Sequence, residues 1–189
     1  MKIKMKYVAF FVLNFLPPFA LAGPLCALSP GGYANHADQP ASPMAADQMS
    51  HTNNVLCSRF PCPSYQFFKN HTAGNAQAYL DQFGAQIRYN PQFMNQVLQS
   101  FGPQATIGIL AHELGHIIDF ANNPSQQSQY QREAAADEYA GCAFALAGAP
   151  PQALSALQQT LFSMGSSPGY PNSHQRAALI QSGYNKCLN

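Results

Sequence analysis

Charged side chains are scarce in this chain of 189 residues. Lysine and arginine together number 9 and aspartate and glutamate 8, so only 9% of residues are charged and the formal net charge is +1. No run of basic residues follows the first few positions, whereas a protein that binds nucleic acid normally carries a clear excess of positive charge. The composition therefore argues against nucleic acid as a partner. Internal repeats are lacking as well.

Long apolar runs are lacking beyond the N-terminus. Three lysines within the first six residues precede an apolar stretch over residues 7–19, which ends in Ala20-Leu21-Ala22. This pattern is typical of a signal peptide over residues 1–22, and the stretch is too short to span a bilayer comfortably, although a retained membrane anchor is the alternative. Cleavage would leave 167 residues, enough for one domain with a core. We therefore predict an exported protein, periplasmic or secreted, with no stable membrane anchor after signal cleavage.

Residues 23–54 are rich in proline, alanine, glycine, serine and aspartate and show almost no apolar periodicity. Such a segment buries too little apolar surface to fold on its own. We predict a flexible leader or short pro-segment over residues 23–54, followed by the functional domain over residues 55–189.

The five cysteines fit an oxidising compartment. Cys57 and Cys62 are close enough in the chain for a local disulfide. A second disulfide between Cys142, one turn beyond Asp137, and Cys187, beyond the predicted helix that contains Arg176, would link these two helices. Because the number of cysteines is odd, Cys26 is left over.

The motif His112-Glu113-Leu114-Gly115-His116 lies in a strongly apolar segment, residues 106–120. Four residues advance a helix by about 6 Å and return to the same face, so the two imidazoles can converge on one ion. Glu113 lies about 100° around the helix from His112, where it can touch a water beside that ion but is poorly placed to be a ligand. A helix that is apolar over most of its circumference is buried, and buried polar groups need partners. The segment therefore predicts a site for one Zn²⁺ ion.

A catalytic zinc site takes three protein ligands and a water. The chain lacks the glycine and the histidine that a metzincin carries after this motif, and no supporting motif surrounds Cys142. Glu133 and Asp137 lie four residues apart on the next predicted helix and share one face. We therefore predict that His112, His116 and Glu133 are the metal ligands, and that Asp137 accepts the free N–H of His112.

The combination of HExxH with Glu133-x-x-Ala136-Asp137 resembles the gluzincin zinc peptidases, in the branch that includes the CAAX prenyl-proteases and their soluble minimal relatives. Members of this family commonly carry a third element, His-Pro-x-x-x-x-Arg, near the C-terminus. Tyr170-Pro171 and Arg176 keep that spacing, with tyrosine where histidine is usual. The resemblance implies that Arg176 lies near the active site. Tyr170, or His174 in the same segment, is the candidate to donate a hydrogen bond to a developing oxyanion.

Residues 75–80 and 85–89 predict two short strands around a turn, and helices are expected on the ligand motifs and on residues 91–100, 151–164 and 173–182. The predicted fold class is α+β: a helix-rich, zincin-like domain with a small sheet or β-hairpin flanking the active-site helix. The resemblance to gluzincins further implies that a strand borders the cleft and that an extended substrate adds to its edge.

These motifs together predict a zinc-dependent endopeptidase that acts on peptides or unfolded proteins. Zinc lowers the pKa of a neighbouring water towards about 7, and Glu113 is the general base that takes its proton. One alternative is an exported zinc-binding protein, chaperone-like or an interaction module, whose site is latent; the tyrosine at position 170 supports it. Another is an amidase that acts on non-peptide amides. The sequence does not separate these substrates, because specificity depends on pocket shape.

Overall fold

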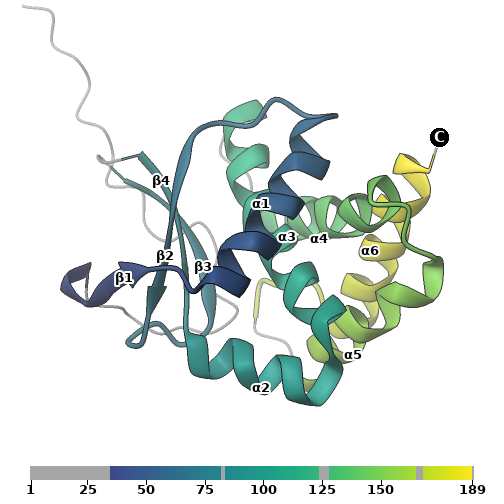
Figure 1. Cartoon of the computed structure of the whole chain (residues 1–189). Coiled ribbons are helices and arrows are strands. Elements are labelled where there is room, and N and C mark those ends of the chain that lie inside the picture. The colour runs from purple at the N-terminus through teal and green to yellow at the C-terminus, as the bar shows by residue number, and fades with distance from the viewer. Residues whose placement is uncertain (1–34, 82–83, 124–127, 165–167, 189) are drawn as a thin grey trace, which may run out of the picture.

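The computed structural model describes residues 35–81, 84–123, 128–164 and 168–188. The predicted signal peptide and Cys26 lie outside these ranges. Along the chain the elements are η1 (Asn35–Ala37), β1 (Asp38–Pro40), α1 (Pro43–Cys57), β2 (Tyr65–Asn70), β3 (Ala76–Asp81), β4 (Gly84–Tyr89), α2 (Pro91–Phe101), α3 (Pro103–Asn122), α4 (Gln129–Leu146), η2 (Pro151–Ala153), α5 (Leu154–Met164) and α6 (Ser173–Cys187), as Figure 1 shows.

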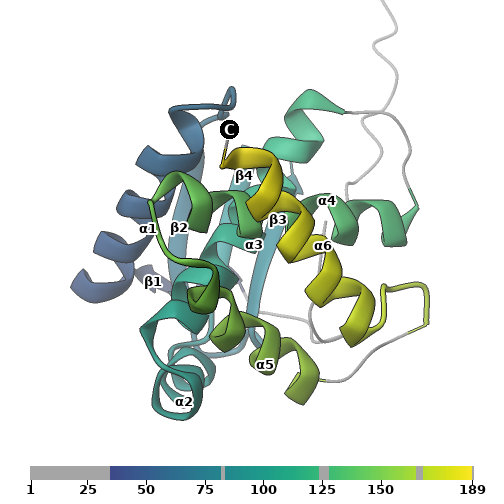
Figure 2. The same cartoon turned by 90° about the vertical axis from the view of Figure 1, so that its right-hand side faces the viewer.

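A small mixed sheet lies on one side of α3, and α4, α5 and α6 lie on the other (Figures 1 and 2). Its strand order is β1-β2-β4-β3, with β1 antiparallel to β2 and β2 parallel to β4. Strands β3 and β4 form an antiparallel hairpin in which Asp81 pairs with Gly84. The predicted α+β class is confirmed, and the two predicted strands are found to within one residue of their expected bounds.

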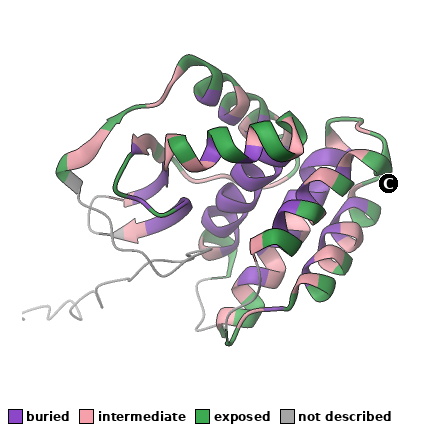
Figure 3. Ribbon diagram, turned by 90° about the horizontal axis from the view of Figure 1, so that it is seen from below, coloured by how far each residue is buried: buried purple, intermediate pink, exposed green. Residues whose placement is uncertain are grey.

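Helix α3 is the centre of the fold. It begins at Pro103, directly after Gly102, whose φ of +86° is a left-handed conformation that glycine adopts without strain. Its apolar side chains are almost all buried, and it contacts α1, α2, α4, α5, β3 and β4. In Figure 3 most of the length of this helix is purple, the colour of buried residues. The helix is therefore enclosed by protein on most sides, as its sequence predicts.

Helices α4 and α6 pack backbone to backbone. A Cβ atom at Gly141 would overlap the backbone oxygen of Ile180, and one at Gly183 would overlap the backbone oxygen of Glu138. Both predicted disulfides are present. Cys142–Cys187 joins these two helices near the C-terminus, with the Cα atoms 5.2 Å apart, and Cys57–Cys62 closes a local loop after α1.

The prediction of a flexible leader is wrong from residue 35 onwards, and the predicted domain boundary at residue 55 falls inside α1. Ser42 caps α1 and Pro43 opens it. The helix buries side chains four, three and four residues apart: Ala45, Met49, Thr52 and Leu56. Before it, Asp38 of β1 makes an ion pair of 2.7 Å with the buried Arg88 of β4. Only two of these buried residues are large and apolar, so the helical spacing of apolar residues is hard to recognise in a segment rich in proline, alanine and serine. Residues 23–34 lie outside the described ranges.

Candidate metal centre

Two neighbouring helices bring together the three residues predicted as metal ligands. His112 and His116 come from α3 and Glu133 from α4, and one ligand atom of each lies within 4.8 Å of the others. The two Nε2 atoms are 3.0 Å apart, and Glu133 Oε2 and Oε1 lie 3.4 Å from His112 Nε2 and 3.9 Å from His116 Nε2, respectively. All three residues are buried, with at most 2% of their surface exposed.

The ligand atoms lie close enough together to surround one metal ion. Zinc binds histidine nitrogen and carboxylate oxygen at about 2.0–2.2 Å, which places neighbouring ligand atoms of a tetrahedron roughly 3.3 Å apart. The two Nε2 atoms, 3.0 Å apart, lie near that value, and the nearest Glu133 oxygens are 3.4 Å (Oε2) and 3.9 Å (Oε1) from them. The fully buried Glu133 carboxylate also lies within reach of both imidazoles, as a ligand set for a divalent cation requires. The His/His/Glu group can therefore hold a metal ion.

The start of α4 fixes the position of Glu133. Ser128 and Gln131 form a capping box, so the first turn is well defined. Gln129 then donates a hydrogen bond of 2.9 Å from Nε2 to Glu133 Oε1. The sequence interpretation missed Gln129, although its spacing of four residues before Glu133 could have indicated the contact.

Small residues let α3 and α4 approach closely at the ligands. A Cβ atom on Gly115 would press against Tyr139 Cβ and the backbone of Ala136, both on α4. The residue directly before His116 therefore has to be small for Glu133 to come within reach of both imidazoles.

Asp137 and Arg176 form a buried relay behind His112. His112 Nδ1 lies 2.9 Å from Asp137 Oδ1, so it donates to that carboxylate and leaves Nε2 for an ion. Arg176 on α6 holds both Asp137 oxygens in a fork, at 2.7 Å from Nη2 and 2.8 Å from Nε. Its Nη2 atom lies 3.6 Å from Glu133 Oε2. Arg176 thus orients Asp137, which in turn orients His112.

The pKa values in the cluster follow from burial and from these contacts. Burial alone would lower the pKa of His112, but its hydrogen bonds to Asp137 and Glu133 raise that pKa to about 9. Burial lowers the pKa of His116 to about 3. Burial opposes the ionised form of Asp137, yet the charge and hydrogen bonds of Arg176 hold its pKa below the usual value. In the metal-free protein at neutral pH, His112 therefore carries a proton and His116 does not.

Glu113 is fully buried beside the cluster, and neither of its carboxylate oxygens has a hydrogen bond of normal geometry from the described part of the chain. Burial raises its pKa to about 7, and the charge of Glu133 adds to this effect. The charge of His112 and the nearby backbone N–H of Ala78 on β3 lower it in part. A buried carboxyl group whose pKa is raised to near neutral pH is typical of a residue that transfers protons.

Strand β3 is the edge strand next to Glu113. Asn90 N–H donates to Asn75 C=O, which makes these two residues a hydrogen-bonded pair. Such pairs alternate along an antiparallel ladder, so the backbone groups of Ala76, Ala78 and Leu80 point away from β4 towards the edge of the described sheet. A row of backbone donors and acceptors therefore passes the Glu113 carboxylate.

In the third motif, the contacts of Arg176 with Asp137 and Glu133 place it at the cluster. His174 is exposed on α6 and lies edge-on against the ring of Phe162, with the ring centres 5.1 Å apart. Tyr170 is half-buried in the segment that leads into α6.

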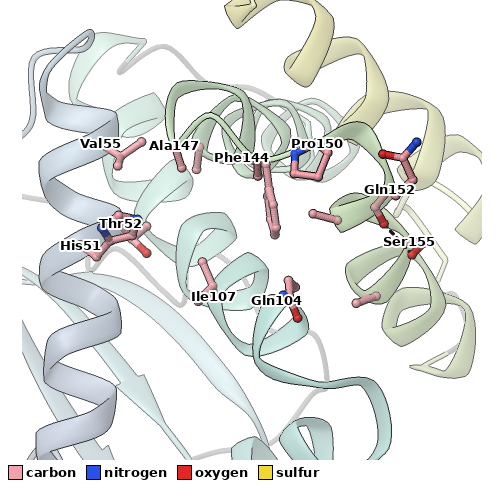
Figure 4. A pocket seen from close by; sticks show the side chains of 14 residues that line it. His51, Thr52, Val55, Gln104, Ile107, Phe144, Ala147, Pro150, Gln152 and Ser155 are labelled. Atoms are coloured by element: carbon pink, nitrogen blue, oxygen red, sulfur yellow. Dashed lines mark hydrogen bonds between the residues drawn. The ribbon is translucent and has the colours of Figure 1, made fainter.

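A hollow of about 530 Å³ lies between α1, the start of α3, the end of α4 and α5 (Figure 4). Its walls are mainly apolar, with Phe144 and Ile107 at the centre, and His51 and Gln104 among its few polar residues. No residue of the metal cluster lines it, and it contains no carboxylate.

No protein-family model matches this chain, and neither the curated proteins nor the solved structures include a significant match.

Proposed function

We propose that this chain is an exported zinc-dependent endopeptidase. The observation that carries the proposal is the pairing of a buried His112/His116/Glu133 group with the buried Glu113 carboxylate beside it, whose oxygens accept no hydrogen bond of normal geometry from the described residues. A structural metal site requires no such carboxylate, whereas hydrolysis requires a general base next to the ion. Export is supported by the two disulfides. Among the described residues, no helix combines the length and apolar character needed to cross a bilayer.

His112, His116 and Glu133 would hold Zn²⁺, which as a Lewis acid lowers the pKa of water towards about 7 and polarises a carbonyl group. Glu113, whose pKa is about 7, would accept a proton from the attacking water and pass it to the leaving amine. Asp137 and Arg176 would keep His112 in the tautomer that presents Nε2.

An extended peptide would be positioned by the edge of β3. The outward backbone groups of Ala76, Ala78 and Leu80 can pair with a substrate strand, which brings a peptide carbonyl past Glu113. Since backbone pairing does not depend on side chains, this contact would accept many sequences. A peptide or unfolded protein is therefore the substrate class that the edge favours.

The decisive experiment compares wild type with Glu113→Gln, which has the same shape but cannot accept the proton. We expect both proteins to bind one equivalent of zinc by elemental analysis. Cleavage of casein should fall by about 10²- to 10⁴-fold in the variant, and chelation should abolish wild-type activity. Glu138→Gln, whose carboxylate pairs with the exposed Lys186 of α6, is the matched control and should keep full activity. Near wild-type cleavage by Glu113→Gln would contradict the assignment.

A second candidate is an exported zinc-binding protein with a chaperone-like or interaction role. The observation that favours it is the complete burial of the ligand side chains, together with tyrosine at position 170. It predicts full zinc occupancy, no cleavage of any unfolded substrate and equal suppression of aggregation by wild type and Glu113→Gln.

A further inference from the structure

An apolar hollow of about 330 Å³ lies between the β3–β4 hairpin and the C-terminal half of α3. Leu80 and Ala85 line it from the hairpin, and Ile117, Phe120 and Ala121 line it from α3. The segment before β2 closes it with Pro63 and Ser64, and no charged side chain is among its lining residues.

The hollow lies further along the same helix and strand as the proposed catalytic centre. Ile117 and Phe120 follow Glu113 by four and seven residues and share its face of α3. Leu80 follows Ala78 by two residues and points to the same face of β3. The same helix and the same strand that enclose Glu113 therefore form the walls of the hollow, roughly 6–10 Å further along the helix.

That offset matches the spacing of an extended peptide, which advances about 3.3 Å per residue. A substrate strand antiparallel to β3, the slightly more stable arrangement, places its N-terminal part over the C-terminal end of β3. A side chain two or three residues before the bond at Glu113 would then lie over Leu80.

We propose that this hollow is the specificity pocket of the enzyme and binds an apolar side chain on the N-terminal side of the scissile bond. This inference rests on the proposed peptidase function. The volume suits a leucine, isoleucine, methionine or phenylalanine side chain. An aspartate or lysine in the same place would lose its hydration without gaining an ionic partner. We expect leucine to be preferred over aspartate by about tenfold or more.

The test uses a mixed peptide library digested by the zinc-loaded protein, with cleavage sites mapped by mass spectrometry. Ala121 is exposed at the rim of the hollow, so Ala121→Trp can fill the space without overpacking the core. Ala46→Trp, an exposed alanine on α1, is the matched control. A second measurement follows the binding, without turnover, of a leucine-containing peptide and its aspartate counterpart to Glu113→Gln, by titration calorimetry.

The expected result is enrichment of large apolar residues at one fixed position before the cleaved bond. The enrichment should fall about tenfold in Ala121→Trp and persist in Ala46→Trp. Cleavage without such enrichment, or with the same enrichment in Ala121→Trp, would overturn the inference and leave the peptidase function standing. If no peptide is cleaved, the peptidase function fails, and the calorimetric titration alone tests the pocket. Tighter binding of the leucine peptide than of the aspartate peptide, lost when Ala121→Trp is added, supports the pocket. Equal binding of the two peptides overturns it.

Discussion

Replacing Asp137 by asparagine tests the relay that holds His112. Asp137 Oδ1 accepts from both His112 Nδ1 at 2.9 Å and Arg176 Nη2 at 2.7 Å, and Oδ2 accepts from Arg176 Nε at 2.8 Å. An asparagine side chain offers one oxygen and one NH₂ group. Whichever way the amide turns, the NH₂ group faces a donor, and the guanidinium of Arg176 loses the charge that balances it in a buried site.

The size of the effect follows from these contacts. Loss of a partner that orients a metal-binding histidine typically weakens metal affinity by about 10- to 100-fold, or roughly 1.4–2.7 kcal/mol. Breaking a buried ion pair by removing one partner costs about 3–5 kcal/mol of stability. We expect the lower end for Asp137→Asn, because one oxygen is retained. For a protein of this size, a loss of about 3 kcal/mol lowers Tm by roughly 6–12 °C.

Zinc affinity should be measured by competition with a chromophoric chelator, and Tm by circular dichroism on the metal-free proteins. Glu138→Gln is the control on the neighbouring residue. Its carboxylate pairs at 2.6 Å with Lys186, a side chain that is 62% exposed, so its loss should cost less than about 1 kcal/mol and leave zinc affinity unchanged. Zinc affinity of Asp137→Asn within twofold of wild type would refute the idea that Asp137 and Arg176 act through His112.

Two further predictions concern pH and the disulfides. The proton on His112, whose pKa of about 9 exceeds its usual 6.5, stabilises the metal-free protein below pH 6.5, and this stabilisation is lost as pH rises through about 9. Because zinc displaces that proton, apparent zinc affinity should rise by up to about tenfold per pH unit between pH 7 and 9, and calorimetry in two buffers should detect proton release; a flat pH profile would contradict this. Removing Cys142–Cys187, which closes a loop of 45 residues, should cost about 4 kcal/mol of stability, and removing Cys57–Cys62, separated by 5 residues, about 2 kcal/mol. Urea unfolding of the paired cysteine-to-alanine variants checks the order, and a larger loss for the shorter loop would argue against it.

The sequence predicted the central helix and the ligand-bearing helix well. The HExxH spacing and the apolar residues around it favour a buried helix, since a helix brings the two imidazoles to within about 6 Å on one face, whereas a strand would hold them about 13 Å apart. The hairpin of β3 and β4 was predicted for a similar reason, because alternating residues flank a short turn ending in Gly84.

The first part of the described chain was not predictable in the same way. Strand β1 is short, and Asp38 becomes part of the fold only through Arg88, fifty residues later in the chain. Helix α1 buries Ala45 and Met49 but few large apolar side chains, so its period is weak in the sequence. Its contact with α3, through Gln48 and Thr106, depends on tertiary packing alone.

The sequence by itself determined that two histidines and a carboxylate would share a buried helix, because helical periodicity is a local property. Only the tertiary structure decided what surrounds them. Glu133 comes within reach of both imidazoles because α3 and α4 touch at Gly115, and Arg176 orients Asp137 because α6 packs on α4 at Gly141 and Gly183. The burial of the Glu113 carboxylate and the apolar hollow beyond it arise where β3 passes over α3. Contacts between segments so far apart in the chain depend on how helices and strands fill space together, which no local spacing of residues specifies.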